Sequence, residues 1–328
     1  MTTKGTVGRS VIMRPTNPEY VYSPQLCFFR CSAGGPLEPR YLYYWVRSPG
    51  FTRRISSLQA QTDMADYVNL RDLRSVEVDL PPLGEQYGIA EVLGSLDDKI
   101  ELNGRLRNDC SALAKELLTG GTNRVRVADV ATLEKGLSYK GNGLVADGAT
   151  VLINLANFRR DGLLRRDALK HYTGEYKPKH TVRAGDLVIA NTDLTQRRVI
   201  LGRPAIVPSD IETAIFTHHV YAVRFEQDPR LAVPLWAALN SAEFRDGAEG
   251  FATGTTVAAL PRDAVLEFEF SVPEDPAVAE RATELLEQGW AAERETVTLA
   301  TIRDTLLPKL MSGEIRVPQA EKLVEQVT

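Results

Sequence analysis

The stretch Leu80–Leu106, LPPLGEQYGIAEVLGSLDDKIELNGRL, decides how the rest of the chain is organised. A proline pair ends an extended segment, and helix-favouring residues then continue to Leu118. Apolar residues recur four and three positions apart from Ile89 to Ile100, with charged residues between them. This narrow apolar seam is typical of a helix that pairs with one other helix, and Asn103 on the seam would fix the register.

A second stretch, about residues 277–311, has a similar length and a looser seam. A helix of 34 residues, from Glu85 to Leu118, would span roughly 50 Å. We therefore expect two long helices that pack antiparallel as a strut. With a slip at Leu106, the predicted seam comprises Ile89, Leu93, Leu96, Ile100, Asn103, Leu106, Cys110, Leu113 and Leu117 of the central helix, and Leu286, Trp290, Leu299, Leu306 and Leu310 of the terminal helix.

The chain contains two copies of one unit, each a globule followed by a long helix. Gly8–Met13 resembles Gly202–Val207 at an offset of 194, and Leu42–Phe51 resembles Leu235–Phe244 at 193. About 70 residues before the second copy's strand GDLVIANT have no counterpart in the first copy, so we expect the first globule to lack its N-terminal half. The predicted domains are 1–80, a partial first globule; 81–120, the central helix; 121–273, the second globule; 274–317, the terminal helix; and 318–328, a tail.

β-branched and aromatic residues predict strands in both globules. The first contains SVIM, YVYSPQLCFFRC and VEVDL, and the second contains TVLINL, GDLVIA, THHVYAVRF and LEFEFSV. The segments PRYLYYWVRSPGF and VPLWAALNSAEF favour short helices. The fold class is therefore α+β: two β-rich globules, the first incomplete, joined by two long helices packed as an antiparallel coiled coil. Within a strand, His218 and His219 would point to opposite faces and could not share a metal ion.

Composition excludes several classes of protein. No apolar run is long enough to span a bilayer, and the N-terminus lacks the apolar region of a signal peptide. Three cysteines form no disulfide framework, and no Cys/His cluster has zinc-ligand spacing. We therefore expect a cytoplasmic protein without a membrane anchor, metal or other cofactor.

The net charge of −4 is unevenly distributed. Residues 85–118 carry seven acidic and four basic residues, and residues 274–328 carry eleven and six. By contrast, Arg159–Arg203 holds eleven Lys and Arg against five Asp and Glu. This stretch is either a solvated basic surface or a patch that binds phosphates.

The segment from Leu80 to Leu106 resembles the central conserved region of the specificity (S) subunit of type I restriction–modification systems. LLPKLMSGEIRV, at Leu306–Val317, is similar to that family's C-terminal signature. TKGTVGRSVIM, SPQLCFFR, YLYYWVRSPGF and GDLVIANTD resemble its target-recognition domains. The similarity covers nearly the whole chain, and the first recognition domain departs from the family by being incomplete.

The resemblance implies a division of labour. Each recognition domain reads one half of a split target in double-stranded DNA, and the helices set the spacing between the halves. The helices also dock two methyltransferase subunits, to which a restriction/translocase subunit adds. The S subunit catalyses nothing and has neither a small-molecule substrate nor a membrane partner.

Candidate DNA-binding residues lie in corresponding loops of both copies. Base readout uses polar or cationic side chains held at the groove, and further cations contact phosphates. In the first copy the candidates are Lys4, Thr6, Arg9, Gln61 and Thr62, with Gln59 beside them. In the second copy they are Lys135, Tyr139, Lys140, Asn191, Thr192, Gln196, Arg197, Arg198, Arg203, Thr253, Thr255 and Thr256, with Ser138 beside them.

Two rival functions remain open. A truncated scaffold would bind methyltransferase subunits without reading DNA effectively. An enzyme is less favoured, because Asn17-Pro18-Glu19-Tyr20 resembles an amino-methyltransferase motif but follows no buried parallel strand or glycine-rich loop. Asp167 to Lys177 imitates a nuclease carboxylate–lysine set, yet it has the composition of a polar connection.

Overall fold

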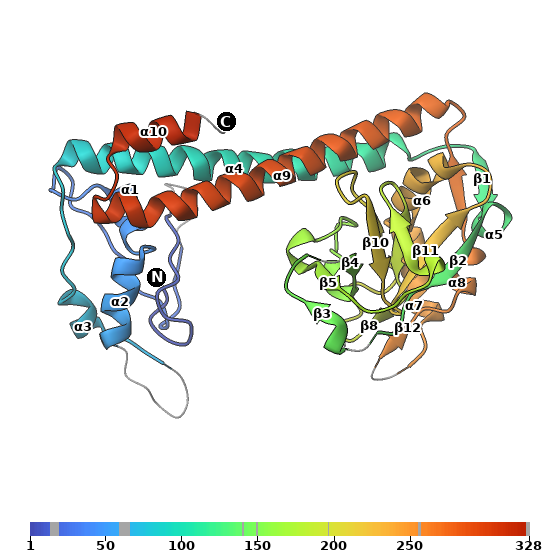
Figure 1. The fold of residues 1–328 in the computed structure, drawn as a ribbon, viewed down its shortest axis with the longest axis horizontal. Helices are drawn as coiled ribbons and strands as arrows, with labels where there is room; N and C mark the ends of the chain where they lie inside the picture. The colour runs from blue at the N-terminus through green and yellow to red at the C-terminus, as the bar shows by residue number, and fades with distance from the viewer. Residues whose placement is uncertain are drawn as a thin grey trace. The chain divides into compact units, whose positions relative to one another are not determined.

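The computed structural model of the chain describes residues 1–13, 20–58, 66–139, 141–148, 150–195, 197–254 and 257–325. The chain divides into two compact units. The first comprises Met1–Arg105 and Glu293–Thr328, and the second comprises Leu106–Ala292 (Figure 1). Each unit contains part of both long helices, α4 (Leu83–Leu117) and α9 (Pro276–Ser312).

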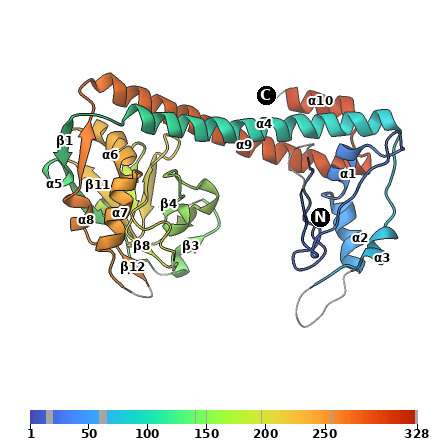
Figure 2. The same cartoon turned by 180° about the vertical axis from the view of Figure 1, so that it is seen from behind.

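The helices α4 and α9 pack against each other, as the sequence predicts. In the first unit, Leu93 near the start of α4 shares a core with Leu306 near the end of α9. In the second unit, Ala114 near the end of α4 shares a core with Leu286 near the start of α9, so the helices run antiparallel (Figure 2). In the first unit, Asn103 Nδ2 also donates a hydrogen bond to Glu295 Oε2 at 2.7 Å.

The predicted seam of α4 needs a correction in the second unit. The prediction places Leu106, Leu113 and Leu117 in the seam, but they are exposed, Leu113 by 46%. The buried positions are Cys110, which belongs to the predicted seam, and Ala114 and Leu118, which take the places of Leu113 and Leu117. A Cβ at Gly289 of α9 would lie 3.5 Å from the Cα of Arg107. Because the helices approach this closely, small residues occupy the interface and the leucines lie outside it.

The rest of the predicted seam is largely buried in the unit to which it belongs. Ile100 is half-buried. The buried seam residues are Ile89, Leu93, Leu96, Asn103, Leu299, Leu306 and Leu310 in the first unit, and Leu286 and Trp290 in the second.

The first unit packs short helices onto this helix pair. They are α1 (Pro39–Trp45), α2 (Pro49–Leu58), α3 (Leu70–Arg74) and α10 (Val317–Glu325). Tyr41, Trp45 and Phe51 of α1 and α2 are buried in one core with the long helices. The buried amide of Gln86 accepts from the backbone N–H of Glu38 at 2.9 Å and donates to the carbonyl oxygens of Pro36 and Pro81. One α4 side chain thus fixes the segment that leads into α1.

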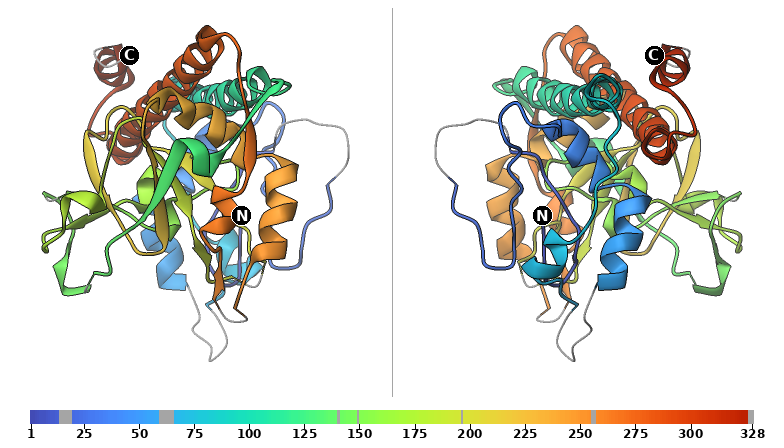
Figure 3. Two further views of the ribbon diagram at one scale, coloured as in Figure 1. Left: turned by 90° about the vertical axis from the view of Figure 1, so that its right-hand side faces the viewer. Right: turned by 90° about the vertical axis from the view of Figure 1, so that its left-hand side faces the viewer.

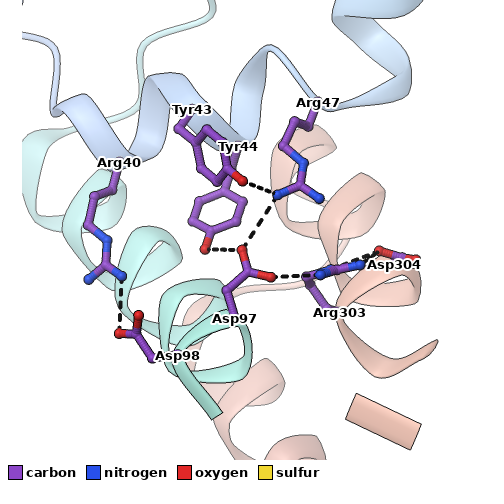
Figure 4. A network of polar contacts seen from close by, with 8 residues as sticks. All are labelled: Arg40, Tyr43, Tyr44, Arg47, Asp97, Asp98, Arg303 and Asp304. Atoms are coloured by element: carbon purple, nitrogen blue, oxygen red, sulfur yellow. Dashed lines mark hydrogen bonds and ion pairs between the residues drawn. The ribbon is translucent and has the colours of Figure 1, made fainter. Parts of the chain in front are cut away.

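A polar network joins α1 to both long helices within the first unit (Figure 4). Asp97 of α4 accepts hydrogen bonds from the hydroxyl of Tyr44 at 2.9 Å and from the guanidinium of Arg303 at 2.7 Å. Arg47 lies 3.5 Å from the same carboxylate, and Arg40 bonds the neighbouring Asp98 at 3.2 Å. The network orients α1 on the helix pair.

The strands predicted in the first globule do not form among its described residues. SVIM, YVYSPQLCFFRC and VEVDL are irregular, and only two isolated bridges occur there, Thr2 with Leu26 and Lys4 with Tyr67. A strand needs a hydrogen-bonding neighbour, whatever the preferences of its residues. In the described part of the first unit, residues 1–3 pair with residues 25–27, but this pairing is too short to form a strand.

The described part of the second unit contains two main sheets and two short strand pairs. The sheet orders are β3-β5-β4-β10-β6 and β2-β11-β7-β9, and the pairs are β1-β13 and β12-β8. The strands are β1 (Asn123–Arg126), β2 (Ala131–Lys135), β3 (Leu144–Val145), β4 (Thr150–Ile153), β5 (Lys170–Tyr172), β6 (Thr181–Arg183), β7 (Leu187–Ala190), β8 (Thr192–Asp193), β9 (Pro204–Ile206), β10 (Thr213–Phe216), β11 (Val220–Phe225), β12 (Ala258–Ala259) and β13 (Glu269–Val272).

Helices α6 (Ala232–Leu239), α7 (Ala242–Phe251) and α8 (Asp263–Leu266) accompany the sheets, with α5 (Val127–Val130) near the start (Figure 3). Five short 3-10 helices complete the described elements: η1 (Gly141–Gly143), η2 (Leu155–Asn157), η3 (Arg166–Ala168), η4 (Pro178–His180) and η5 (Pro229–Leu231). The helix α6 packs against β7, β9 and β13, and its Trp236 is fully buried. Because β10 pairs parallel with β4 and antiparallel with β6, the sheet is mixed.

The helices repeat with the period seen in the sequence. α1, α2, α3 and α4 begin at residues 39, 49, 70 and 83, and α6, α7, α8 and α9 begin at 232, 242, 263 and 276. The separation is 193 residues in every case, which agrees with an internal duplication. No helix in the described ranges is both long enough and apolar enough to span a bilayer.

Candidate nucleic-acid interface

Three of the predicted loops of the second unit meet around the turn 217–219. Leu137, in the first loop, forms a β-bridge with Thr217. The loop that follows β7 is joined to the loop that follows α7, because β8 pairs with β12. In addition, Arg198 donates to the carbonyl oxygen of Gly254 at 3.3 Å. The structure thus gathers segments that are more than 100 residues apart in the sequence at one end of the sheets.

The two histidines form this turn, contrary to the expectation that they lie in a strand. β10 ends at Phe216 and β11 begins at Val220, so His218 and His219 occupy the connection. Their rings stack with centroids 3.8 Å apart, rather than pointing to opposite faces. Strand alternation does not apply in a turn, which is why the prediction was wrong. Among the described residues, no three His, Cys, Asp or Glu side chains could together hold a metal ion.

Asn191 and Thr192, both predicted to contact DNA, hold the turn in place. The buried Asn191 donates from its side chain to the carbonyl oxygen of His218 at 3.1 Å. The Thr192 hydroxyl lies 2.8 Å from Nδ1 of His219. Burial lowers the pKa of His219, and the nearby His218 and Lys135 lower it further. A neutral ring therefore bonds Thr192 at pH 7.

A buried carboxylate shapes the loop that follows β8. Asp193 is fully buried and accepts hydrogen bonds from the backbone N–H and hydroxyl of Thr195, both at 2.7 Å, and from the backbone N–H of Ile200 at 2.8 Å. Arg198 adopts a left-handed backbone conformation with φ of 47°. Sequence reasoning missed Asp193, although an Asp two residues before a Thr is a recognisable turn signal.

The remaining described candidates of the second unit divide into exposed and structural side chains. Lys135 at the end of β2, Arg197 and Thr253 are exposed or half-buried at the surface of the loops. Tyr139 has its ring edge-on to Tyr172 at 5.9 Å, so it packs against the small core beneath the loop. Lys140, Gln196, Thr255 and Thr256 lie outside the described residues.

Arg203 lies at the end of the loop that follows β8. Its side chain is half-buried and donates to the carbonyl oxygen of Val199 at 3.3 Å. Burial lowers its pKa, while Asp161 opposes the shift. Its charge contributes to the lowered pKa values of Lys115 and Arg245, so these three cations share one region of the second unit beside α4. The sequence alone could not predict that Arg203 and Arg197 have different surroundings, because the chain reverses between them only in the folded structure.

Part of the basic stretch Arg159–Arg203 is paired with nearby carboxylates. Arg159 bonds Asp161 at 2.6 Å, Arg165 bonds Asp167 at 2.7 Å, and Lys179 bonds Glu134 at 2.8 Å. Such pairs neutralise the field that would attract phosphates. The exposed cations of this stretch whose side chains make no hydrogen bond or ion pair to another described residue are Arg160, Lys170, Lys177, Arg183 and Arg197.

In the first unit, Lys4, Thr6 and Arg9 lie in a turn at the surface. The hydroxyl of Thr2 accepts the backbone N–H of Arg9 at 3.0 Å and so closes this turn. The candidates Gln61 and Thr62, together with Gln59 and the Asn17–Glu19 part of the methyltransferase-like motif, lie outside the described residues.

Comparison with known proteins finds a family model that matches part of the chain and solved structures that match most of it. Residues 2–110 match the model of the type I restriction modification DNA specificity domain. The S subunit of a type I restriction–modification system from M. genitalium matches with a TM-score of 0.54 at 17% identity, over 84% of this chain and 73% of that chain. The HsdS subunit from Thermoanaerobacter tengcongensis matches with a TM-score of 0.35 at 17% identity, over 85% and 71% of the two chains. No curated protein matches with statistical support.

At 17% identity, the M. genitalium subunit shows that the fold is shared. The residues that match the family model include most of α4. Residues 2–110 therefore resemble a type I restriction modification DNA specificity domain, and the chain shares its fold with the type I S subunit from M. genitalium.

Proposed function

We propose that this chain is the DNA sequence-specificity subunit of a type I restriction–modification complex. It recognises a bipartite duplex target and docks methyltransferase subunits, through which a restriction/translocase subunit joins, and it catalyses no reaction itself. The observation that carries the proposal is the convergence of three loops of the second unit around His218 and His219, within a specificity-subunit fold.

The loop cluster has the chemistry of a DNA reader. Lys135 and Arg197 are available for phosphates, which position a protein on the duplex. Thr253 lies in the adjoining loop and can reach base edges. The hydrogen bonds of Asp193 hold the loop in one conformation before DNA binds. This preorganisation reduces the ordering cost of binding.

The exposed leucines of α4 in the second unit supply a surface for the methyltransferase. Leu106, Leu113 and Leu117, here named the leucine stripe, follow one another at seven and four residues and therefore share a helix face. Cys110, Ala114 and Leu118 are buried on the side of this helix segment that adjoins the stripe. An exposed apolar stripe at this spacing is suited to packing against a helix of another protein.

DNA binding by the whole chain, with methyltransferase subunits present, tests the reading site. A duplex selected from a random pool is titrated at several salt concentrations with the wild type and with the Lys135→Ala/Arg197→Ala variant. We expect weaker binding and a log–log salt slope less negative by about 0.9 for each phosphate that the variant no longer neutralises. The matched control is Arg230→Ala, because Arg230 is exposed but paired with Asp228 at 2.9 Å. If the double variant binds DNA with the affinity and the salt slope of the wild type, Lys135 and Arg197 do not contact DNA phosphates.

A scaffold that binds methyltransferase without effective DNA reading is the second candidate function. The observation in its favour is that the described residues of the first unit form no sheet. Recovery of methyltransferase by the chain, combined with no enrichment of any sequence from the random pool, would favour the scaffold. Replacing Leu113 and Leu117 with Lys should abolish methyltransferase recovery under either function, which separates docking from DNA reading.

A further inference from the structure

The turn formed by residues 217–219 is held on two sides by the segments that meet around it. His218 donates its backbone N–H to the carbonyl oxygen of Leu137, in the loop after β2, at 2.9 Å. The carbonyl oxygen of His219 accepts the backbone N–H of Asn191, which follows β7, at 2.9 Å. These bonds fix the backbone of the turn, and therefore the place of its two side chains, before any ligand binds.

The two imidazole rings of this turn stack with centroids 3.8 Å apart, and both are half-buried. Nδ1 of His219 is engaged by the Thr192 hydroxyl at 2.8 Å. Nδ1 of His218 is buried and has no hydrogen-bond partner among the described residues. No described residue bonds Nε2 of either ring. Nε2 is therefore the nitrogen of each ring that is left to bond a ligand.

The acidic side chains on the strands and loops that meet at the turn are engaged elsewhere. Glu134 of β2 is paired with Lys179 at 2.8 Å. Asp193 of β8 accepts the backbone N–H groups of Thr195 and Ile200. The other described ionisable side chains on these segments are the cations Lys135, Arg197 and Arg198 and the phenols of Tyr139 and Tyr221. No described carboxylate there is left to balance a protonated histidine.

A proton on this histidine pair therefore needs a counter-charge from outside the described chain. Two protonated rings 3.8 Å apart would repel each other. Burial, His218 and Lys135 all lower the pKa of His219, in that order of size. A phosphate oxygen beside the rings would supply the counter-charge and accept a hydrogen bond from a protonated ring.

We propose that the stacked pair His218–His219 contacts a DNA phosphate and takes up one proton as it does so, which makes DNA binding tighter as the pH falls. The proton comes from the solvent and goes to a ring nitrogen, and the protonated ring donates a hydrogen bond to the phosphate oxygen. A second proton is disfavoured, because the rings are stacked. The inference rests on the proposed DNA-binding function of the same loop cluster.

The direction of the pH dependence follows from the proton count of the free and the bound chain. In the free chain the pKa of His219 lies below 6.5, so the ring is neutral at pH 7. A phosphate beside the pair raises that pKa, so the bound chain holds more protons than the free chain between the two values. The affinity therefore rises as the pH falls through this window, by up to about tenfold per pH unit for one proton.

The test is the affinity of the full chain, with methyltransferase subunits present, for the duplex selected from the random pool, from about pH 8 to about pH 6 at constant ionic strength. We expect the affinity of the wild type to rise as the pH falls, and the rise to be at least about threefold smaller in His218→Gln and in His219→Gln. His180→Gln is the matched control, because His180 is a half-buried histidine in η4, outside the loop cluster. Calorimetry in two buffers of different ionisation enthalpy measures the proton uptake directly, and only the His218 and His219 variants should reduce it.

A purely structural role of the turn predicts a different result. The two variants would then lose affinity by the same factor at every pH and take up as many protons as the wild type, and this outcome overturns the proposal. An equal loss of pH dependence in His180→Gln also overturns it. Salt-dependent DNA binding without a histidine-linked pH dependence contradicts this inference alone, whereas no DNA binding at any pH contradicts the proposed function as well.

Discussion

Asp97 of α4 and Arg303 of α9 are joined within the first unit by a hydrogen bond of 2.7 Å, with side chains only 22% and 15% exposed. The same carboxylate accepts the hydroxyl of Tyr44, so one residue links α1, α4 and α9 (Figure 4). A shielded, charge-assisted bond is stronger than the exposed ion pairs found elsewhere on the chain.

Replacing Asp97 with Ala should therefore destabilise the first unit by about 1–3 kcal/mol, because Arg303 and Tyr44 lose a common acceptor. Hydrogen exchange at the backbone amides of α1, followed as a function of urea concentration, measures the change. The control is Asp98→Ala, whose partner Arg40 is 45% exposed and which should have a much smaller effect. Equal effects of the two variants would show that the network does not anchor α1.

The corrected seam predicts opposite outcomes for two neighbouring residues of α4. Leu113→Ala should leave the stability of the second unit within about 0.5 kcal/mol of wild type, because the side chain is exposed. Ala114→Leu should cost about 1–3 kcal/mol, because Ala114 is fully buried and a larger side chain overpacks the interface. Thermal unfolding of both variants measures the difference. A larger loss of stability in Leu113→Ala than in Ala114→Leu would show that the seam follows the predicted slip at Leu106.

Asp193 should control the loop that presents Arg197 without itself touching DNA. Asp193→Ala leaves the backbone N–H groups of Thr195 and Ile200 without their acceptor. The loss should destabilise the second unit by about 1–3 kcal/mol and accelerate amide exchange at Ile200. Hydrogen exchange read by NMR or mass spectrometry measures this change. Asp167→Asn, which affects an exposed pair with Arg165, should leave the exchange of Ile200 unaltered.

The turn 217–219 should lose stability in mild acid. The pKa of His219 is lowered in the folded chain, chiefly by burial, so the unfolded chain binds a proton more readily than the folded one. The contribution of His219 to the stability of the folded chain is therefore fully present above pH 6.5, the ordinary histidine pKa, and it is lost as the pH falls below that value. Amide exchange at Asn191, whose N–H bonds the carbonyl oxygen of His219 at 2.9 Å, should accelerate relative to the intrinsic exchange rate as the pH falls through this range. His219→Gln should reduce this pH dependence.

Local patterns in the sequence were sufficient for the long helices. The proline pair, the apolar spacing and Asn103 predicted α4 and its antiparallel partner, because helix periodicity is set by neighbours three and four residues away. The offset of 193 residues predicted the repeat of the short helices for the same reason. The phase of the seam beyond Asn103 was wrong, since leucine and alanine both suit a helix interface and only the interhelical distance at Gly289 selects between them.

The sequence by itself determined the helical framework, the duplication and the loops that carry cations, because each depends on contacts within a short segment. Only the tertiary structure decided which cations gather, that Arg203 lies beside Lys115 and Arg245, and that the histidines form a turn. It also decided that SVIM in the first unit is irregular while PAI in the second is a strand. Strand formation and charge clustering depend on neighbours that are distant in the sequence, and those neighbours are fixed only when the chain folds.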